Sequence, residues 1–582
     1  MMKFIEFDEE TCDSCYKCLR TCPTKAISFN KNQRHIIDSL CIKCGICQKT
    51  CPREALHIRN NAERIMEMIN NGEEVAVSLA PSYVGAFGLD TPKVIVGALK
   101  AIGFSFVEET AIGAEMVASQ YDEYIMKGDG GNMITSCCPS ATYLIEQHYP
   151  TLISSVIPVV SPMIAHGKNI KAVYGQQVKV VFIGPCMAKI AEAEEISGAI
   201  DGVMTFEELD GLIKNRGMNL NEYEAMDFRR SSYSRGRAFP LGGSLKKNGE
   251  MNKDGEYRFF HVDGIEACKE VLNEIMKGSL NHTCIEMNIC EGSCMNGPDM
   301  PINKLGRFAR ELFMRKYVEK GVYLNAEKVK SESNEVCLKD KCVQKDELSR
   351  QFSDKKLYQQ EPNVEKIRQT MANMGKYSKD DELNCGACGY KTCYDKAKAV
   401  LLGYSEIETC LPYLREKAES MQSLMIENSP NGVVLLNKRL EIVEVNPAFN
   451  KMFNSENLPI EEMPIKLFVD HNVFNEVLDK EQSVFNKKIF INDLDCYFFV
   501  NVVYLNETKS VLGFLTDISL NEQRQKEFTR VKEETLLKTQ EVIDKQMRVA
   551  QEIASLLGET TAETKMSLKS LHKLVSNEGS VF

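Results

Sequence analysis

The chain has 582 residues, so we expect several domains, because single domains usually hold roughly 100–200 residues. Its hydrophobic content of 43% and charged content of 26% are ordinary for globular protein. The formal net charge of -11 argues against a general nucleic-acid-binding protein, which would normally present a basic face. No apolar run is long enough to span a membrane, so no membrane segment is expected.

Cysteine is the informative residue type. The 22 cysteines fall into repeated C-x-x-C groups, a spacing that favours metal ligands over the disulfides of a short secreted domain. Residues 1–8 show no basic segment followed by an apolar one, so no signal peptide is predicted. We expect a cytoplasmic protein, because thiolates that hold iron also need a reducing compartment.

Two four-cysteine runs, each closed by Cys-Pro, predict a ferredoxin-like domain over residues 1–60. Their spacing is that of bacterial ferredoxins with two [4Fe–4S] clusters, in which the fourth cysteine of each run reaches the other cluster. The predicted ligands are Cys12, Cys15, Cys18 and Cys51 for one cluster, and Cys41, Cys44, Cys47 and Cys22 for the other. Gly45 is expected to let the backbone approach a sulfide closely. Zinc, which also binds C-x-x-C pairs, is the alternative.

The next region reads as an α/β domain. A strand is predicted over Val75–Leu79, and a helix is predicted to open at Thr91-Pro92 and to end at about Ile102. A second buried strand over Lys179–Ile183 ends at Gly184-Pro185-Cys186. Strands that alternate with helices in this way place a functional site at the strand ends.

Four cysteine-bearing segments lie in this region. They are Thr135-Ser136-Cys137-Cys138-Pro139, Gly184-Pro185-Cys186-Met187-Ala188-Lys189, Glu286-Met287-Asn288-Ile289-Cys290 and Glu291-Gly292-Ser293-Cys294-Met295-Asn296-Gly297. Spacing alone indicates that Cys290 and Cys294 could share a metal cluster. It does not link them to Cys138 or Cys186, which by themselves would be interpreted as buried structural cysteines.

Together with Leu79-Ala80-Pro81-Ser82, these segments resemble the signature motifs of [FeFe] hydrogenases, in the same order and behind the same ferredoxin module. The resemblance implies a hydrogenase catalytic domain over residues 73–322. It implies that one [4Fe–4S] cluster is bound by Cys138, Cys186, Cys290 and Cys294. Cys294 would also bridge to a diiron subsite with CO, cyanide (CN) and azadithiolate, and the two parts together form the H-cluster.

The resemblance also implies roles for the residues around this cluster. Cys137 would face the open iron position as the last proton relay, and Lys189 would donate to a cyanide ligand, as would groups at Pro81 and Ser82. A thiol with a tuned pKa can exchange protons, and a cation can position an anionic ligand. A lone lysine is usually a solvated surface residue, but the position of Lys189, three residues after Cys186, favours the donor role.

Several positions depart from the family pattern in the pocket itself. Gly184 and Asn288 stand where the family usually has Met. Ala141 or its neighbour stands where a Trp usually follows the first motif. We therefore expect an intact metal site in an altered pocket.

The usual proton path runs from the relay cysteine through Glu, Ser and Glu. Gln120 or Tyr121 falls near one carboxylate position, and Ile157 falls at the serine position. Isoleucine cannot carry a proton, so we expect slow turnover. Slow turnover fits a sensor better than a bulk catalyst.

The chain continues with a predicted linker over residues 325–360, rich in Lys, Glu, Asp and Ser, in which Cys337 and Cys342 stay unassigned. Residues 361–415 contain a further motif made of Cys385, Cys388, Cys393 and Cys410. This set resembles the small single-[4Fe–4S] domain of several anaerobic redox proteins. Zinc is again the alternative.

Residues 421–518 are similar to PAS domains, which act as sensor or relay modules. The segments Ile426–Leu436 and Glu441–Phe449, with a turn at Asn437-Lys438 between them, predict helix, strand, turn, strand and then a helix entered at Asn446-Pro447. Strands around residues 488–491, 497–503 and 511–517 complete an antiparallel sheet. An unrelated α+β domain is the alternative, and no ligand of this domain is predicted.

Residues 519–582 are predicted to be helical. Ile543, Ala550 and Leu557 lie seven apart, and Met547 and Ala554 follow the first two by four residues. This apolar seam suits a short coiled coil, through which a sensed change could reach a partner or a second copy of the chain.

The predicted fold class is therefore multidomain, with α/β and α+β parts. The leading hypothesis is an [FeFe]-hydrogenase-like protein that oxidises or evolves H2 slowly and senses H2 or redox state through the PAS domain. It implies four [4Fe–4S] clusters, a diiron subsite, protons and a redox partner such as ferredoxin, and it leaves room for a signalling partner and a homodimer. The alternatives are a bulk ferredoxin-linked hydrogenase and an iron–sulfur scaffold protein that lacks the diiron subsite.

Overall fold

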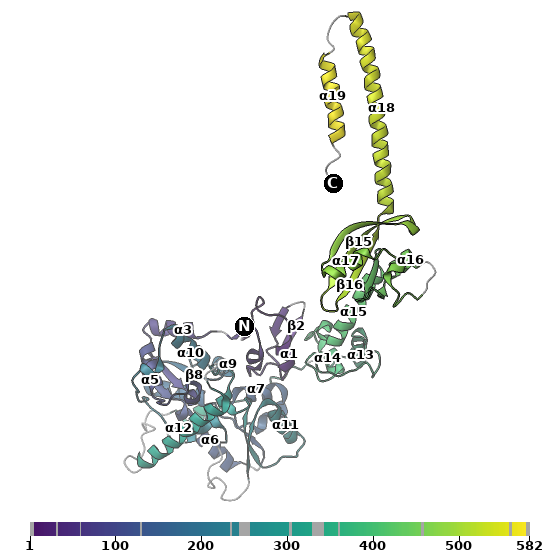
Figure 1. Ribbon diagram of the computed structural model, residues 1–582. Coiled ribbons are helices and arrows are strands. Elements are labelled where there is room, and N and C mark those ends of the chain that lie inside the picture. Colours follow the sequence, from purple (N-terminus) through teal and green to yellow (C-terminus); the bar gives the residue numbers. More distant parts are fainter. Residues whose placement is uncertain are drawn as a thin grey trace. The chain divides into compact units, whose positions relative to one another are not determined.

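The computed structural model describes residues 5–30, 33–58, 60–128, 131–232, 235–243, 257–301, 305–328, 343–358, 361–454, 459–557 and 562–577. The chain divides into two compact units, Met1–Leu414 and Arg415–Phe582 (Figure 1). Among the described residues, no helix combines the length and the apolar character needed to cross a membrane.

Unit 1 begins with a small domain of two similar halves. Its elements are β1 (Ile5–Phe7), α1 (Lys17–Thr21), β2 (Ile27–Asn30), β3 (Gln33–Ile36), α2 (Ile46–Thr50) and β4 (Leu56–Ile58). β1 pairs with β4 and β2 pairs with β3, both antiparallel. The fourth cysteine of each run, Cys22 or Cys51, is the residue that ends a helix. The backbone therefore turns sharply at both cysteines.

A four-stranded parallel sheet forms the first half of the central α/β domain. Its order is β6 (Phe106–Glu109), β5 (Val75–Leu79), β8 (Lys179–Gly184) and β9 (Gly202–Thr205). Every residue of β5 is buried, as expected for a parallel strand with both faces covered. The helix predicted from Thr91 begins instead at Val94 and ends at Ile102 (α5), because residues 91–93 form a turn.

A second parallel sheet, of three strands, completes this domain. Its order is β10 (Arg258–Asp263), β11 (Thr283–Asn288) and β7 (Met133–Ile134). The helices of the domain are α3 (Ala62–Asn70), α4 (Tyr83–Phe87), α5, α6 (Ala111–Lys127), α7 (Pro139–His148), α8 (Pro162–Tyr174), α9 (Ala188–Glu195), α10 (Phe206–Asn215), α11 (Ile265–Met276) and α12 (Arg307–Lys328). This α/β architecture agrees with the sequence prediction.

Part of the predicted linker packs on the α/β domain. Residues 343–358, which we call the strap, include a short 3-10 turn over Lys345–Leu348. Ser349 then forms an antiparallel bridge with Val159. The N–H of Arg350 donates to the carbonyl of Pro158 (3.1 Å). Cys337 and Cys342 lie outside the described residues.

Unit 1 ends with a small domain that carries the third group of C-x-x-C cysteines. Its helices are α13 (Val364–Asn373) and α14 (Cys393–Leu401), which enclose a core with Ile367 and Met371 at its centre. The next helix, α15 (Leu411–Glu427), begins at the residue after Cys410 and continues into unit 2.

Unit 2 contains a five-stranded antiparallel sheet. Its order is β13 (Ile442–Val445), β12 (Gly432–Leu436), β16 (Ser510–Asp517), β15 (Cys496–Leu505) and β14 (Val484–Ile491). The short helices are α16 (Pro447–Phe453) and α17 (Asn472–Lys480). As predicted, the helix after β13 opens at Asn446, whose side chain accepts the N–H of Phe449 (2.9 Å). The sheet is the one expected for a PAS-type domain.

Two helices follow the sheet, α18 (Ser519–Leu557) and α19 (Ala562–Asn577). Ile543 and Met547, from the predicted seam, are half-buried, whereas Ala550 is exposed. The side chains of Ala554 and Leu557 lie outside the described part of the chain. The coiled coil stays a prediction.

Candidate active site and metal centres

The predicted site residues follow the carboxyl ends of parallel strands in both sheets. Pro81 and Ser82 follow β5, Cys137 and Cys138 follow β7, Cys186 follows β8, and Cys290 follows β11. Parallel strands present their carboxyl ends at one edge of a sheet, which is where α/β proteins build their sites. The two edges face each other, because the ammonium of Lys189, after β8, donates to the carbonyl of Cys137, after β7 (3.4 Å).

The four cysteines that the resemblance assigns to one cluster lie near one another. Burial and the thiolates of Cys186, Cys138 and Cys294 raise the pKa of Cys290. Burial and the thiolates of Cys138 and Cys186 also raise the pKa of Cys294. Thiolates gathered in this way repel each other, so the arrangement is favourable only when a cationic group binds them. The chemistry of this donor set therefore fits an iron–sulfur cluster.

Lys189 lies at the centre of the polar contacts. Its side chain is buried to 9% exposure, and its ammonium is 2.8 Å from a carboxylate oxygen of Glu192. Burial, followed by the carboxylate of Glu286 and the thiolate of Cys138, raises the pKa of Cys137 to about 12. Without a bound metal group, Cys137 is therefore a neutral thiol at pH 7.

Ser82 provides a direct test of whether the pocket suits a ligand. Its side chain is 1% exposed, and its hydroxyl has no hydrogen-bond partner among the described residues. A buried hydroxyl without a partner is costly, and such groups are rare unless something absent from the protein accepts the bond. The hydroxyl of Ser82 fits the role of a donor to a bound anionic ligand such as cyanide.

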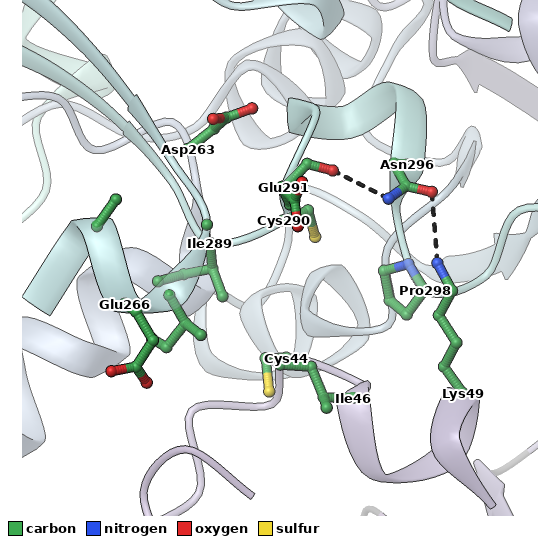
Figure 2. A pocket seen from close by; sticks show the side chains of 13 residues that line it. Cys44, Ile46, Lys49, Asp263, Glu266, Ile289, Cys290, Glu291, Asn296 and Pro298 are labelled. Carbon is green, nitrogen blue, oxygen red and sulfur yellow. Dashed lines mark hydrogen bonds between the residues drawn. The ribbon is translucent and has the colours of Figure 1, made fainter. Parts of the chain in front are cut away.

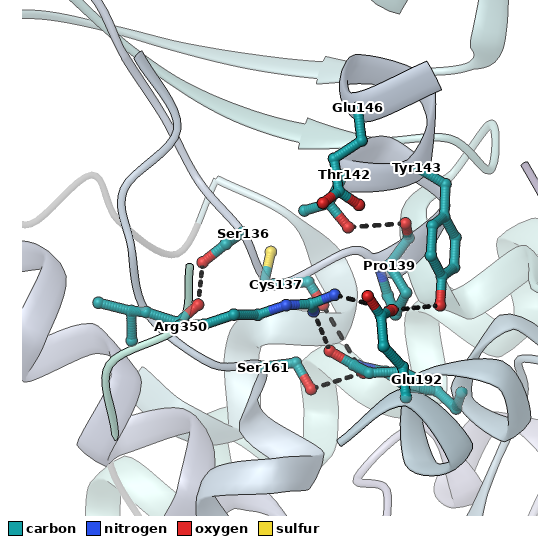
Figure 3. A network of polar contacts seen from close by, with 12 residues as sticks. Ser136, Cys137, Pro139, Thr142, Tyr143, Glu146, Ser161, Glu192 and Arg350 are labelled. Atoms are coloured by element: carbon teal, nitrogen blue, oxygen red, sulfur yellow. Dashed lines mark hydrogen bonds and ion pairs between the residues drawn. The ribbon is translucent and has the colours of Figure 1, made fainter. Parts of the chain in front are cut away.

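A buried network of polar contacts surrounds Glu192 (Figure 3). Glu192 is fully buried and binds Lys189, the hydroxyl of Ser161 (2.8 Å) and the guanidinium of Arg350 (2.9 Å). Arg350 comes from the strap and also reaches Glu195 (3.2 Å). Sequence reasoning did not identify Glu192 or Arg350. The spacing of Lys189 and Glu192 on α9 could have indicated the first pair, whereas no local pattern indicates Arg350.

The residues that the resemblance places near the proton path bond to one another and to backbone groups. The hydroxyls of Tyr121 and Ser136 are 3.0 Å apart, and that of Ser136 donates to the carbonyl of Val159 (2.6 Å). Burial and the thiolate of Cys137 raise the pKa of Tyr121 far above its usual value. Ile157 is buried, and its N–H donates to a backbone carbonyl. These contacts end at backbone groups, which do not titrate.

The altered positions Gly184 and Asn288 have physical consequences for the pocket. A Cβ at Gly184 would lie 2.5 Å from the ring of Phe182, so that ring fills the space that a larger residue would need. The amide of Asn288 donates to the hydroxyl of Ser293 (3.5 Å), which is 3.2 Å from a ring nitrogen of His261. The pocket is therefore more polar on the Asn288 side than a methionine would make it.

The cysteines of the N-terminal domain group into two sets. Burial and the thiolates of Cys12, Cys51 and Cys15 raise the pKa of Cys18 to about 12. Burial raises the pKa of Cys47 most, and the thiolates of Cys44, Cys41 and Cys22 raise it further. The nearest charged neighbours are thus the partners expected from the interleaved ferredoxin pattern.

The second of these sets adjoins the central site. A Cβ at Gly45 would lie 2.5 Å from Pro298 Cβ and 2.7 Å from Met187 Sδ, and the φ of +76° also favours glycine. Gly45 thus allows close approach to the α/β domain. The thiolate of Cys44 is also among the charges that raise the pKa of Cys290.

A cavity of about 440 Å³ lies at this contact, lined by Cys44, Ile46 and Lys49 on one side and by Cys290, Asn296 and Pro298 on the other (Figure 2). The ammonium of Lys49 donates to Asn296 (3.4 Å), whose amide donates to the carbonyl of Glu291 (3.0 Å). The Lys49–Asn296 bond joins the two domains at the cavity.

The third cysteine group also lines one hollow. Cys385, Cys388, Cys393 and Cys410 surround it together with Lys376 and Lys396. In the part of the chain that the structure describes, no group of three or more His, Cys, Asp or Glu side chains is arranged to hold a single metal ion.

Comparison with known families decides what the central domain is. Residues 73–252 and 242–298 match the family model of the iron-only hydrogenase large subunit, C-terminal domain. The chain carries an [FeFe]-hydrogenase domain. A 4Fe–4S dicluster model matches residues 4–65 in front of it, an Fe–S cluster model matches residues 381–412, and a PAS model matches residues 420–489. The predicted family and fold class are confirmed.

The curated relatives are hydrogenases. Iron hydrogenase 1 of Clostridium pasteurianum is 29% identical over 377 residues, which are 51% of this chain and 65% of that protein. The periplasmic [Fe] hydrogenase large subunit of Nitratidesulfovibrio vulgaris is 28% identical over 52% of this chain and 87% of its own length. A solved [FeFe] hydrogenase from Chlamydomonas reinhardtii is 17% identical, with a TM-score of 0.40 over 51% of this chain and all of its own.

The residues that the resemblance singled out lie at strand ends of the two sheets, with β5 and β8 as neighbouring strands. The four cysteines, the buried Lys189 and the unpartnered hydroxyl of Ser82 fit an H-cluster. In that group Cys138, Cys186, Cys290 and Cys294 would hold the cubane. These ligand roles stay predictions.

Proposed function

We propose that this chain oxidises and evolves H2 slowly at an H-cluster and senses H2 or redox state through its PAS domain. The observation that carries the proposal is the convergence of four thiols, Lys189 and the unpartnered Ser82 hydroxyl at the strand ends of a hydrogenase domain. The proposal includes four [4Fe–4S] clusters and a cytoplasmic location. When bound, the diiron group would supply the redox-active metal for the reaction of H2 to two protons and two electrons.

The protein residues position the group and move the protons. The ammonium of Lys189, fixed by Glu192, can donate to an anionic ligand, and Ser82 can donate from the β5 side. The thiol of Cys137 can donate its proton, and the thiolate that remains can accept another, so the side chain can pass protons on. Ferredoxin-type clusters next to Cys290 would take the electrons, because Cys44 adjoins that cysteine.

The slow rate follows from the proton supply. The Tyr121–Ser136 pair ends at a backbone carbonyl, and Ile157 offers no side-chain acceptor. A catalyst with a poor proton supply suits detection better than bulk turnover. The PAS domain, which resembles sensor modules, supports the same reading. A signalling partner and a second copy of the chain are the receivers that this proposal requires.

Infrared spectroscopy of the chain matured with diiron assembly proteins tests the proposal. We expect bands of bound CO and cyanide, and H2 oxidation with a dye acceptor below about 10 turnovers per second. Cys138→Ala and Cys294→Ala should lose the bands and the activity. Cys284→Ala is the matched control, because Cys284 is buried in β11 outside the predicted ligand set and should keep both.

Each rival hypothesis predicts a different result. A bulk hydrogenase would show the bands with high turnover, and a scaffold protein would show cubanes without the bands. Normal activity in Cys138→Ala or Cys294→Ala would contradict the ligand assignment.

A further inference from the structure

The small domain after the strap contacts the ferredoxin module directly. A Cβ at Gly389 would lie 3.0 Å from Arg20 Cα and 3.2 Å from the carbonyl oxygen of Leu19. The hydroxyl of Ser28 donates to the carbonyl of Gly403 (3.4 Å). Gly389 immediately follows Cys388, so the closest contact lies beside a predicted cluster ligand. The arrangement parallels that of Gly45, which follows Cys44 and packs against the hydrogenase domain.

Cys388 and Cys22 share neighbours across this contact. Burial lowers the pKa of Lys25, and the thiolates of Cys22 and Cys388 both oppose that shift. Tyr390 also lies within electrostatic reach of both cysteines.

Cys22 belongs to the ferredoxin set that also contains Cys44, and Cys44 adjoins Cys290 of the hydrogenase site. The predicted H-cluster ligands and the third cysteine group thus both adjoin this one ferredoxin set. The set of Cys12, Cys15, Cys18 and Cys51 is not needed for this route.

Two buried cations lie at the hollow of the third cysteine group. Lys396 is 1% exposed and Lys376 is 9% exposed, and both line the hollow with the cysteines. Lys396 donates to the hydroxyls of Ser405 and Thr409 and to the carbonyl of Glu406. Its direct hydrogen-bond acceptors are neutral oxygens, and the carboxylates of Glu406 and Glu408 lie within electrostatic reach. A buried positive charge beside a cluster stabilises the more negative, reduced state and raises the reduction potential.

We propose that the Cys385–Cys410 domain is the electron outlet of the chain, reduced by the ferredoxin cluster of Cys22 and Cys44 and held at a higher potential by Lys396 and Lys376. The inference rests on the proposed iron–sulfur loading. When loaded, the cluster held by Cys41, Cys44, Cys47 and Cys22 would supply one electron at a time, and the cluster held by Cys385, Cys388, Cys393 and Cys410 would take it up. The outlet ends at Cys410, and α15, which leads to the PAS domain, begins at the next residue.

The reduction potential of the outlet cluster is measured in the full chain, reconstituted with iron and sulfide but without the diiron group. In an EPR-monitored titration with dithionite, we expect the outlet cluster to be reduced before both ferredoxin clusters. Lys396→Met should lower its midpoint potential, and Lys396→Arg should recover most of that loss. The matched control is Lys398→Met, because Lys398 lies on the same helix but pairs with the exposed Glu361 (2.7 Å).

The contact is tested by the magnetic interaction between clusters in the fully reduced chain. We expect a nearby ferredoxin cluster to broaden the EPR signal of the outlet cluster. The signal should be narrower in Gly389→Ala than in the unaltered chain, because a Cβ there would meet Arg20 Cα at 3.0 Å and push the domains apart. Gly386→Ala is the control, because Gly386 has a similar positive φ of +69° but its Cβ would meet only the carbonyl of Tyr390, 3.9 Å away.

An unbroadened outlet signal in the unaltered chain, an outlet reduced last, or zinc in place of the fourth cluster would overturn the proposal. These outcomes are independent of the infrared bands and of H2 oxidation. A chain that fails as a hydrogenase could still pass this test, and the reverse also holds.

Discussion

At the scale of single residues, charge and burial set the chemistry at the centre of the hydrogenase domain. Glu192 is fully buried, and Lys189 and Arg350 neutralise it from opposite sides. Such pairing is required, because an isolated buried charge costs several kcal/mol (about 3–5) when its partner is removed. The thiol of Cys137 lies 3.7 Å from the hydroxyl of Thr135, outside this set of ion pairs. The positive charge of Lys189 acts on the Cys137 thiol and favours its thiolate form.

Replacing Cys137 by alanine tests its relay role. We expect Cys137→Ala to lower H2 oxidation about 100-fold or more, because a positioned acid–base group contributes roughly 10²–10⁴ in rate. The infrared bands of the matured protein should remain, because the cluster ligands are intact. Loss of the bands would mean that Cys137 holds the metal group and does not act as a relay.

At the scale of elements, the strap is packed into the support of the hydrogenase site. Leu348 and Arg350 form backbone hydrogen bonds with residues 158–160, and the side chain of Arg350 enters the core. Lys355, further along the strap, binds Glu146 (2.9 Å) and Glu195. The strap, which the sequence predicted as part of a linker, thus supplies the buried guanidinium of Arg350. This group lies beside Glu192, the carboxylate that pairs with Lys189.

We expect Arg350→Met to destabilise unit 1 by about 3 kcal/mol, since it leaves Glu192 with a single cationic partner. Arg350→Lys should recover part of this loss. Lys345→Met on the same strap should cost about 1 kcal/mol or less, because its ion pair with Glu123 is exposed. Urea-dependent hydrogen exchange of β8 in the full chain measures these differences. Equal effects of Arg350→Met and Lys345→Met would contradict a special role for Arg350.

At the scale of the whole molecule, three cysteine-bearing domains belong to one compact unit and the PAS domain belongs to another. The first unit has its own cores around β5, around β11 and around Ile367. The PAS core around Phe449 and Phe474 is separate. A unit with its own core is expected to fold without the other.

Deletion of residues 420–582 should therefore leave H2 oxidation within about twofold of the full chain. Any signalling response to H2 should be lost, because the PAS domain and the two final helices are removed. The assay compares dye reduction and the output of the receiving protein for both lengths. A truncated chain that loads its clusters but no longer oxidises H2 would count against a separate sensory unit.

Much of this protein could be predicted from local patterns. The ferredoxin spacing, the strands before Pro81 and before Cys186, and the helix cap at Asn446 are short-range features, since neighbouring residues alone produce them. The predicted N-cap of α5, Thr91, lies two residues before the actual N-cap, Lys93, because Thr91-Pro92 opens a turn before the helix. The resemblance of the motifs, and not their spacing, grouped Cys138 and Cys186 with Cys290.

Other features depend on contacts between distant segments, which no local pattern encodes. The strap brings Arg350 to Glu192 across 158 positions, and Gly389 packs on Arg20 from the far end of the unit. The sequence predicts that Gly45 approaches a sulfide, and the structure places Pro298 and Met187 against it. The amino-acid sequence by itself determined which residues can bind metal and which elements carry them. Only the tertiary structure decided which buried charges meet and which clusters adjoin, because burial and proximity arise when separate elements pack.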